Sequence, residues 1–311
     1  MAFPDAARLV SGDILVVYRA GQRHVDRTGR ILLSRCRVPG NGPVFDEPEL
    51  VCDTDLDDRD PSVVQLADGT VLLNFFRLDA RRRSVRLAMT MSRDGGFSWT
   101  SPRDIDTPGF STGLAVSDAV LELPSGELLM AAYGTPDNGF PGSFLLRSRD
   151  GGETWPKITR LAVSPTIVFE EPALSRLPDG RILAMLRSEN GGTGSLHQTL
   201  SLDEGWTWSD PERLDLWGYP ADLLVLQTGQ IVMAYGYRQF PPGIRCCVAD
   251  AAGLSWSIHR ERILRHDGHD NGELGYPATV ALGGGDLLTV YYFTGREGGQ
   301  PYIAGTRFTV E

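Results

Sequence analysis

The sequence predicts an all-β protein, a six-bladed β-propeller of four-stranded antiparallel blades, and three observations support this prediction. The first is a tight turn with a leucine three positions before its glycine, which recurs six times along the chain. The copies are Leu9/Gly12, Leu66/Gly69, Leu123/Gly126, Leu177/Gly180, Leu226/Gly229 and Leu282/Gly285. Successive glycines are 57, 57, 54, 49 and 56 residues apart, a period typical of blades built from hairpins.

The second observation is that apolar strands flank these turns. The segment 60–77 is the clearest unit, because it reads as an apolar strand, a turn at 67–69 and a second apolar strand. One small twisted sheet cannot bury both of its faces, whereas six sheets packed radially can. A closed ring also leaves no long exposed edge strand.

The third observation is a second turn, the Asp box, with the pattern Ser-x-Asp-x-Gly-x-x-Trp. Close copies span 92–99, 148–155 and 201–208, and a weaker copy ends at Trp256. Asp and Ser side chains can bond the turn amides, Gly accepts a positive φ, and Trp can pack between neighbouring sheets. We therefore expect these residues to serve folding and not catalysis.

The repeat fills the chain, so we predict a single domain over residues 1–311. The blades are expected at 3–52, 58–108, 113–164, 168–216, 218–265 and 270–311. The last blade ends after its third strand. Its fourth strand is therefore either missing or supplied by the residues before Phe3.

Composition restricts the partners of this protein. The formal net charge is −10, from 30 basic and 40 acidic residues. Nucleic acids and anionic membranes both need a basic surface, so neither is expected as a partner. A small anionic ligand held by a few arginines stays possible.

Neither cofactor nor metal is predicted. The four cysteines show no metal-binding spacing, and we expect buried free thiols in a reducing compartment. His266 and His269 lie in a glycine-rich loop without a third spaced ligand. The N-terminus lacks a basic start followed by an apolar run, so we expect no signal peptide and a cytoplasmic location.

Reactive side chains are expected at one end of the ring, the mouth. Strand one of each blade descends to the Leu-x-x-Gly turn and strand two returns, so strand-one starts and strand-two ends share this face. Counting back nine residues from the glycines gives Phe3, Asp60, Ser117, Glu171, Pro220 and Tyr276. Counting forward seven to nine residues reaches Arg19, Arg77, Arg187 and Arg238. Such charges either bind a ligand or form salt bridges that close the channel.

The three close Asp boxes resemble those of the sialidase (neuraminidase) superfamily, the six-bladed propellers with BNR or Asp-box repeats. The resemblance extends over the whole chain, blade by blade. The boxes are specific for the fold, and they also occur in proteins that are not sialidases.

The resemblance implies three catalytic residues. In that family a tyrosine at the start of the last inner strand is the nucleophile, which matches Tyr276. A glutamate starting the fourth blade activates it, which matches Glu171, and a loop aspartate of the first blade is the general acid/base, for which Asp26 is nearest. A carboxylate beside the anomeric carbon would repel a carboxylate nucleophile, so a phenol with a nearby base suits such a sugar.

The resemblance also implies arginines that bind a substrate carboxylate. Arg187 matches the arginine of blade four, and Arg238 or Arg245 could supply that of blade five. The family's first arginine belongs to a Phe-Arg-Ile-Pro motif, but this chain has Phe3-Pro4, so Arg59 or Arg19 would have to compensate. The expected substrate-binding residues are Arg187, Arg238, Arg245, Arg19, Arg59, Asp60, His24 and Asp118.

We therefore expect an exo-acting glycoside hydrolase for a small-molecule or oligosaccharide substrate with a sialic-acid-like or other acidic sugar. The alternatives are a sugar-binding propeller without turnover, a polysaccharide lyase in which Tyr276 moves a proton of a uronate, and a structural or protein-interaction propeller. Hydrolysis requires the Tyr276 hydroxyl to lie close to the Glu171 carboxylate, and a binding module does not.

Overall fold

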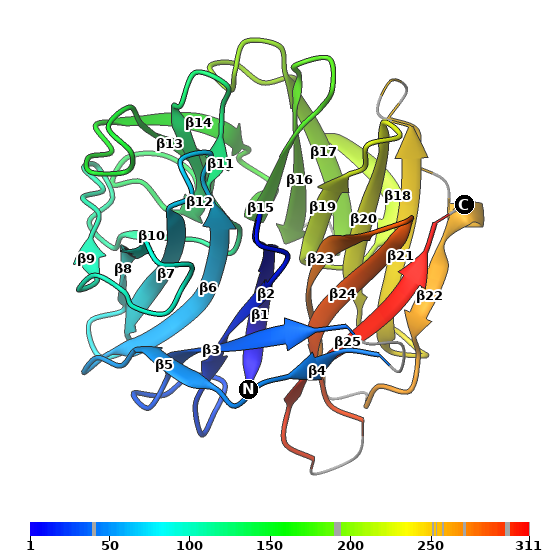
Figure 1. Ribbon diagram of the computed structural model, residues 1–311. Coiled ribbons are helices and arrows are strands. Elements are labelled where there is room, and N and C mark those ends of the chain that lie inside the picture. Colours follow the sequence, from blue (N-terminus) through cyan, green and yellow to red (C-terminus); the bar gives the residue numbers. More distant parts are fainter. Residues whose placement is uncertain are drawn as a thin grey trace.

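Six antiparallel sheets surround a central axis in the computed structural model of this chain (Figure 1). The structure describes residues 1–38, 42–189, 194–250, 252, 254–256, 258–269, 272–295 and 299–310. The six-bladed all-β propeller predicted from the sequence is confirmed. The blades follow one another along the chain with bounds close to those expected from the repeat.

Each blade runs from an inner strand to an outer edge. The inner strands are β1 (Ala2–Arg8), β6 (Asp57–Gln65), the short pair β10 (Leu114–Ala115) and β11 (Leu121–Glu122), β15 (Val168–Arg176), β19 (Ala221–Val225) and β23 (Gly275–Gly283). The second strands are β2 (Ile14–Ala20), β7 (Val71–Asp79), β12 (Leu128–Gly134), β16 (Ile182–Glu189), β20 (Gln230–Tyr237) and β24 (Asp286–Phe293).

The third and outer strands complete the sheets. The third strands are β3 (Arg30–Arg37), β8 (Ser84–Ser92), β13 (Gly142–Ser148), β17 (Ser195–Ser201), β21 (Gly243–Asp250) and β25 (Tyr302–Thr309). The outer strands are β4 (Val44–Phe45), β5 (Glu49–Cys52), β9 (Arg103–Asp104), β14 (Lys157–Val163), β18 (Glu212–Trp217) and β22 (Arg262–Arg265), with a 3-10 turn at Ile258–Arg260 before β22.

The Leu-x-x-Gly turns join the first two strands of the blades as predicted. In the first blade the Gly12 amide donates to the Leu9 carbonyl at 2.8 Å, and Leu9 is buried. Gly12 has a φ of 95°, a conformation that favours glycine. The same bond closes the turns at Gly69, Gly126, Gly180 and Gly229. The sixth turn differs, since three consecutive glycines at 283–285 all have positive φ.

Four inner strands share a backbone bulge at the mouth. Their ladders shift register at this point, and the bulged residues have φ values of 52°, 46°, 45° and 48°. These residues are Phe3, Asp60, Glu171 and Tyr276. Each lies nine positions before the turn glycine and is followed directly by a proline. Residues other than glycine rarely adopt positive φ, so four in equivalent places mark a special, strained site.

The Asp boxes have the structural role expected of them. In the second box the Ser148 hydroxyl donates to Asp150 at 2.7 Å, and Asp150 accepts from the Thr154 amide at 2.9 Å. Trp155 is buried between the second and third blades, in one cluster with side chains of β8 and β12. The boxes therefore hold the turns between third and outer strands and fill the space between blades.

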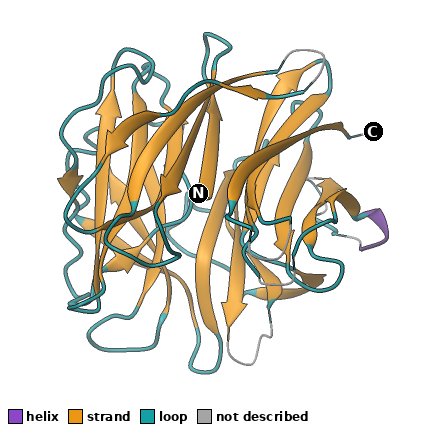
Figure 2. Cartoon of the chain, turned by 90° about the horizontal axis from the view of Figure 1, so that it is seen from below, coloured by secondary structure: helices purple, strands orange, loops and turns teal. Residues whose placement is uncertain are grey.

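The ring closes by side-chain packing between the first and last blades. Strand β1 contacts both β6 and β23, and the N-terminus lies near the middle of the view in Figure 2. Val16 and Tyr18 share an apolar cluster with Val280 and Leu288. Within the described residues the last sheet has three strands, β23, β24 and β25. The segment before Phe3 does not supply a fourth strand, because it belongs to β1.

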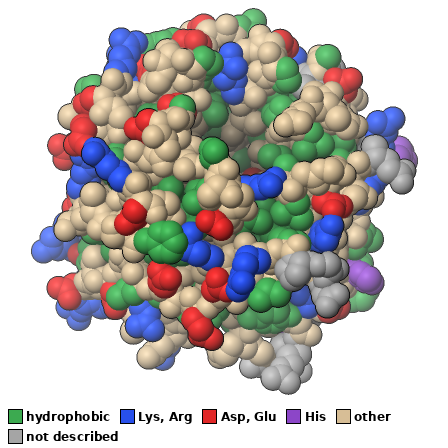
Figure 3. Space-filling view, in the orientation of Figure 1, with side chains coloured by type: hydrophobic (Ala, Val, Ile, Leu, Met, Phe, Trp, Pro, Cys, Tyr) green, Lys and Arg blue, Asp and Glu red, His purple; other side chains and the backbone are tan. Residues whose placement is uncertain are grey.

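The state of the cysteines and the distribution of surface charge are consistent with what the composition predicts. All four cysteines are free and buried. Figure 3 shows acidic and basic side chains interspersed over one face of the molecule. Among the described residues, no helix is long and apolar enough to cross a membrane.

Candidate active site

A tyrosine and a glutamate meet at the mouth although they lie 105 positions apart in the sequence. The Tyr276 hydroxyl donates a hydrogen bond to Oε1 of Glu171. Both residues occupy the inner-strand bulge, one in β23 and the other in β15. The structure thus brings together the predicted nucleophile and its predicted base.

Arg187 holds the other oxygen of Glu171. Its Nη1 lies 3.0 Å from Oε2 of Glu171, and its Nε donates to Glu189 at 2.9 Å. The guanidinium also lies over the ring of Tyr219, 4.1 Å from the centroid. Glu171 therefore accepts from Tyr276 on one side and from a cation on the other, which fixes its orientation.

A second carboxylate, Asp60, enters the mouth from β6. It is 4% exposed, and its Oδ2 lies 3.5 Å from Nε of Arg59. Burial raises the pKa of Asp60 to about 7, while the Arg59 charge opposes the rise and the Glu171 charge adds to it. Asp60 is therefore close enough to the Tyr276–Glu171 pair to affect the protonation of that pair.

Arg238, which follows β20, completes the mouth cluster. Its Nε donates to the Leu274 carbonyl at 3.0 Å, and its Nη2 lies 3.4 Å from the Tyr292 hydroxyl. These two partners are neutral. The mouth cluster consists of Tyr276, Glu171, Asp60, Arg59, Arg187 and Arg238.

The environment keeps the Tyr276 phenol protonated at rest. Burial, followed by the negative charges of Glu171 and Asp60, raises the pKa of Tyr276 well above its usual range. Such a phenol attacks a carbon centre only if a base accepts its proton during the step. Glu171 is already hydrogen-bonded to that proton and is placed to be the base.

Three of the expected substrate-binding residues are engaged outside the mouth cluster, although Arg19 is near enough for its charge to act on Asp60. Arg245 lies on the third strand β21, where it pairs with Glu261 at 2.5 Å and stacks on Tyr237. Arg19 is 2% exposed and pairs with Asp57 at 2.7 Å. Asp118 accepts from the Leu174 amide at 2.7 Å, which ties the third blade to the fourth.

The first-blade loop carries the other two predicted residues. Asp26 accepts hydrogen bonds from the amides of Thr28 at 2.6 Å and Arg23 at 2.5 Å, and also from the Thr28 hydroxyl. The pKa of Asp26 is lowered: slight burial acts against this, but the bonds from Thr28 and Arg23 outweigh it. His24 lies at the mouth, with Nδ1 3.2 Å from Glu273.

Three further aromatic residues lie at the mouth: Phe3, which the count from the turn glycine had placed there, and Tyr292 and Tyr133, which the sequence did not single out. Phe3 packs against Tyr276 with ring centroids 4.7 Å apart, and Tyr292 lies 5.9 Å from Tyr276. The pKa of Tyr133 is raised well above its usual range by burial and by the Glu171 and Asp60 charges, which places it nearby. Phe3 followed from its place nine residues before the turn glycine, whereas no sequence pattern pointed to Tyr133 or Tyr292.

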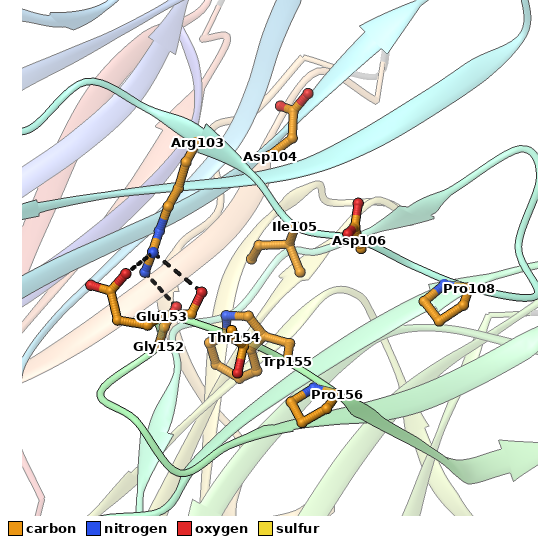
Figure 4. Close-up of a pocket in the computed structure, with 10 residues that line it drawn as sticks. All are labelled: Arg103, Asp104, Ile105, Asp106, Pro108, Gly152, Glu153, Thr154, Trp155 and Pro156. Carbon is orange, nitrogen blue, oxygen red and sulfur yellow. Dashed lines mark hydrogen bonds and ion pairs between the residues drawn. The ribbon is translucent and has the colours of Figure 1, made fainter.

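A cavity lies away from the mouth, between the second and third blades (Figure 4). It has a volume of about 230 Å³ and is lined by Arg103, Ile105 and Trp155 among others. Arg103 lies at one side of it and donates to the Gly152 carbonyl, so this cavity is part of an Asp-box contact (Figure 4). Within the described part of the chain, no group of three or more His, Cys, Asp or Glu side chains is arranged to hold a metal ion.

Comparison with known families gives a match over most of the chain. The family described as "BNR repeat-like domain" matches residues 9–289. Human Sialidase-4 is 32% identical over 174 residues, which is 50% of this chain and 32% of that protein. The chain therefore spans about a third of the length of this curated relative.

Solved structures show the same fold. A protein of unknown function from Dyadobacter fermentans has a TM-score of 0.88 and 26% identity, covering 100% of this chain and 94% of its own. The Hadza microbial sialidase Hz136 has a TM-score of 0.77 and 17% identity, covering 99% of this chain and 65% of its own. The second likeness shows the fold alone.

Proposed function

Since this chain belongs to the BNR repeat-like family, we propose that it is an exo-acting glycoside hydrolase with Tyr276 as the nucleophile and Glu171 as its base. The hydrogen bond from the Tyr276 hydroxyl to Glu171 carries this proposal. A sugar-binding propeller would need arginines and aromatic side chains but no such pair. The bond therefore favours turnover over binding alone.

The proposed reaction has two displacements. In the first, the Tyr276 oxygen attacks the anomeric carbon, the phenol proton passes to Glu171, and the bond to the leaving group breaks as an acid at the mouth protonates the leaving oxygen. In the second, water attacks the same carbon and returns a proton to that acid, while Tyr276 leaves and regains its proton from Glu171. The burial that raises the pKa of Tyr276 keeps it neutral until substrate is in place.

The mouth arginines support an acidic sugar as the substrate. Arg238 bonds to the neutral oxygens of Leu274 and Tyr292, whereas Arg187 already lies against Glu171 and Glu189. A substrate carboxylate would therefore bind best at Arg238, as a charge-assisted hydrogen-bond partner. A carboxylate beside the anomeric carbon would also explain a phenol in place of a carboxylate nucleophile.

The first experiment screens aryl glycosides of sialic acid, related nonulosonic acids, uronic acids and neutral sugars. The wild-type protein is expected to release the phenol from at least one acidic glycoside. An ultraviolet-absorbing unsaturated product from a uronide would identify a lyase instead. Binding of sugars without release of phenol from any glycoside would identify a binding module.

The second experiment traps the nucleophile. A fluorinated analogue of the accepted sugar slows the second displacement, so mass spectrometry of the digested protein should find the sugar on the peptide with Tyr276. Tyr276→Phe and Glu171→Gln are expected to lower kcat by about 10³-fold or more with an unchanged circular dichroism spectrum. The matched control is Tyr291→Phe, which also removes one phenol hydroxyl. The Tyr291 hydroxyl bonds Thr306 and is not part of the mouth cluster. Full activity in both mouth variants would refute the assignment.

A further inference from the structure

His24 and Glu273 form a pair at the edge of the mouth that the proposed reaction has not yet used. Nδ1 of His24 lies 3.2 Å from Oε1 and 3.3 Å from Oε2 of Glu273. An ionised carboxylate only accepts hydrogen bonds, so Nδ1 donates, and Nε2 is left for another partner. Histidine held by a carboxylate in this way is a recurrent arrangement in acid–base catalysis.

The pair lies beside the reacting groups. The His24 ring and the Tyr276 ring both pack on Phe3, with centroids 5.3 Å and 4.7 Å from it. Nη1 of Arg59 donates to the His24 carbonyl at 2.6 Å, which ties the loop to the mouth cluster. His24 is thus anchored through its backbone, through Nδ1 and through an edge-to-face contact with Phe3.

His24 is also open to a substrate. Its side chain is 50% exposed, whereas that of Asp60 is 4% exposed. A cavity of about 200 Å³ adjoins it, lined by His24 and Glu273 together with Arg23, Gln300 and Pro301. The leaving group of an exo-acting hydrolase departs toward solvent, so a proton donor at the exposed edge is well placed to protonate it.

The residue expected to be the proton donor is poorly suited to it in this structure. Both carboxylate oxygens of Asp26 accept bonds from Arg23 and Thr28 within the same loop. Those bonds stabilise the ionised form, which cannot donate a proton. Asp60 is enclosed and lies against Arg59.

We propose that His24, oriented by Glu273, is the general acid/base of the hydrolysis, and that the adjoining cavity receives the leaving group. The inference rests on the proposed function. In the first displacement the protonated His24 gives its Nε2 proton to the glycosidic oxygen as the bond from carbon to that oxygen breaks. In the second, neutral His24 takes a proton from the attacking water, which restores the starting charges.

The test uses two glycosides of the same accepted sugar that differ in the leaving group. One carries a dinitrophenol, which departs without protonation, and the other carries unsubstituted phenol, which needs a proton. His24→Ala is expected to lower kcat/KM for the phenyl glycoside by about 10²–10⁴-fold. For the dinitrophenyl glycoside the loss should stay below about tenfold. Glu273→Gln should give a weaker effect of the same kind, as expected of a positioning residue.

Azide supplies a readout that a folding defect would not reproduce. The azide ion attacks the glycosyl intermediate without a base, so it should accelerate His24→Ala on the dinitrophenyl glycoside and yield a glycosyl azide. His266→Ala, which removes an exposed histidine of another loop, serves as the matched control and should show neither effect.

Each other outcome overturns the assignment. If Asp26→Asn shows the leaving-group dependence and His24→Ala does not, Asp26 is the acid and the proposal for His24 fails, while the glycosidase function stands. Equal losses of kcat/KM on both glycosides in His24→Ala would show that His24 only contacts the substrate. If wild type cleaves neither glycoside of any sugar, the proposed function fails and this inference fails with it.

Discussion

The aspartates of the Asp boxes and those of the central channel make similar hydrogen bonds in opposite surroundings. Asp150 is exposed and accepts from Thr154 and Ser148 of its own turn. Asp222 lies deep in the ring and accepts from the Thr279 amide of the next blade at 2.8 Å. Hydrogen bonds, first of all those from Thr154, lower the pKa of Asp150 to about 2, while burial raises the pKa of Asp222 to about 7.

The channel set repeats on alternate blades. Asp5 accepts from the Val63 amide at 2.7 Å, Asp118 from the Leu174 amide and Asp222 from the Thr279 amide. The pKa of Asp118 is raised first by burial and then by the charges of Asp5 and Asp222, so the three carboxyl groups are neighbours. The comparison teaches that donors around an exposed aspartate favour its ionised form, whereas the donors to the channel aspartates do not offset burial.

The largest expected effect on stability comes from ionising the channel. Because the folded-state pKa values of Asp5 and Asp222 are raised to about 7, their contribution to stability is fully present below the unfolded pKa of about 4 and is lost as pH rises through 7. We expect a loss on the order of 2 kcal/mol per carboxyl group between pH 5 and pH 8, measured by denaturant unfolding.

The double variant Asp5→Asn/Asp222→Asn removes this titration and keeps an oxygen that can accept each amide. Its stability should therefore vary less with pH than that of wild type. An equally steep pH dependence in the variant would show that the channel carboxyl groups are already ionised in the folded protein.

A smaller effect on stability is expected from the box residue Asp150, and its pH dependence runs in the opposite direction. The pKa of Asp150 is lowered, so its contribution is present above the unfolded pKa of about 4 and is lost as pH falls toward 2. Asp150→Ala should lower the Tm at pH 7 by about 2–4 °C. Calorimetry at pH 7 and pH 3 should find a smaller difference at the lower pH, and an unchanged difference would contradict this account.

The smallest expected effect is on the pKa of Asp150, and it distinguishes the contributions of the individual hydrogen-bond donors in the box. Thr154→Val should raise the pKa of Asp150 more than Ser148→Ala does, because the Thr154 hydroxyl makes the largest contribution to the lowered pKa. Carbon-detected NMR titration of the Asp150 carboxyl group measures both. The reverse order would assign the main role to Ser148.

The sequence predicted those parts of the site that follow the repeat. A turn glycine fixes the register of each inner strand, so counting residues located Tyr276, Glu171 and Asp60 at one end of the ring. Arg187 and Arg238 follow from the same count along the second strands. Box geometry was equally predictable, because all its partners lie within one short turn.

Contacts of third-strand and loop residues could not be read from the repeat. Arg245 was expected at the mouth, but it lies on the third strand β21 and pairs with Glu261. Glu189 and Glu273 reach the mouth from positions next to loops. The strand repeat does not predict where side chains at such positions point. The partners of Asp26 depend on the fold of its own short loop, which residue types alone do not determine.

The shared inner-strand bulge has a consequence for how such a protein changes over evolution. Phenylalanine, aspartate, glutamate and tyrosine all occupy one main-chain conformation in four different blades, each followed by proline. A substitution at any of these four positions would change a side chain at the mouth while the main-chain conformation stays the same. New specificities could thus arise on this ring by exchange of side chains alone.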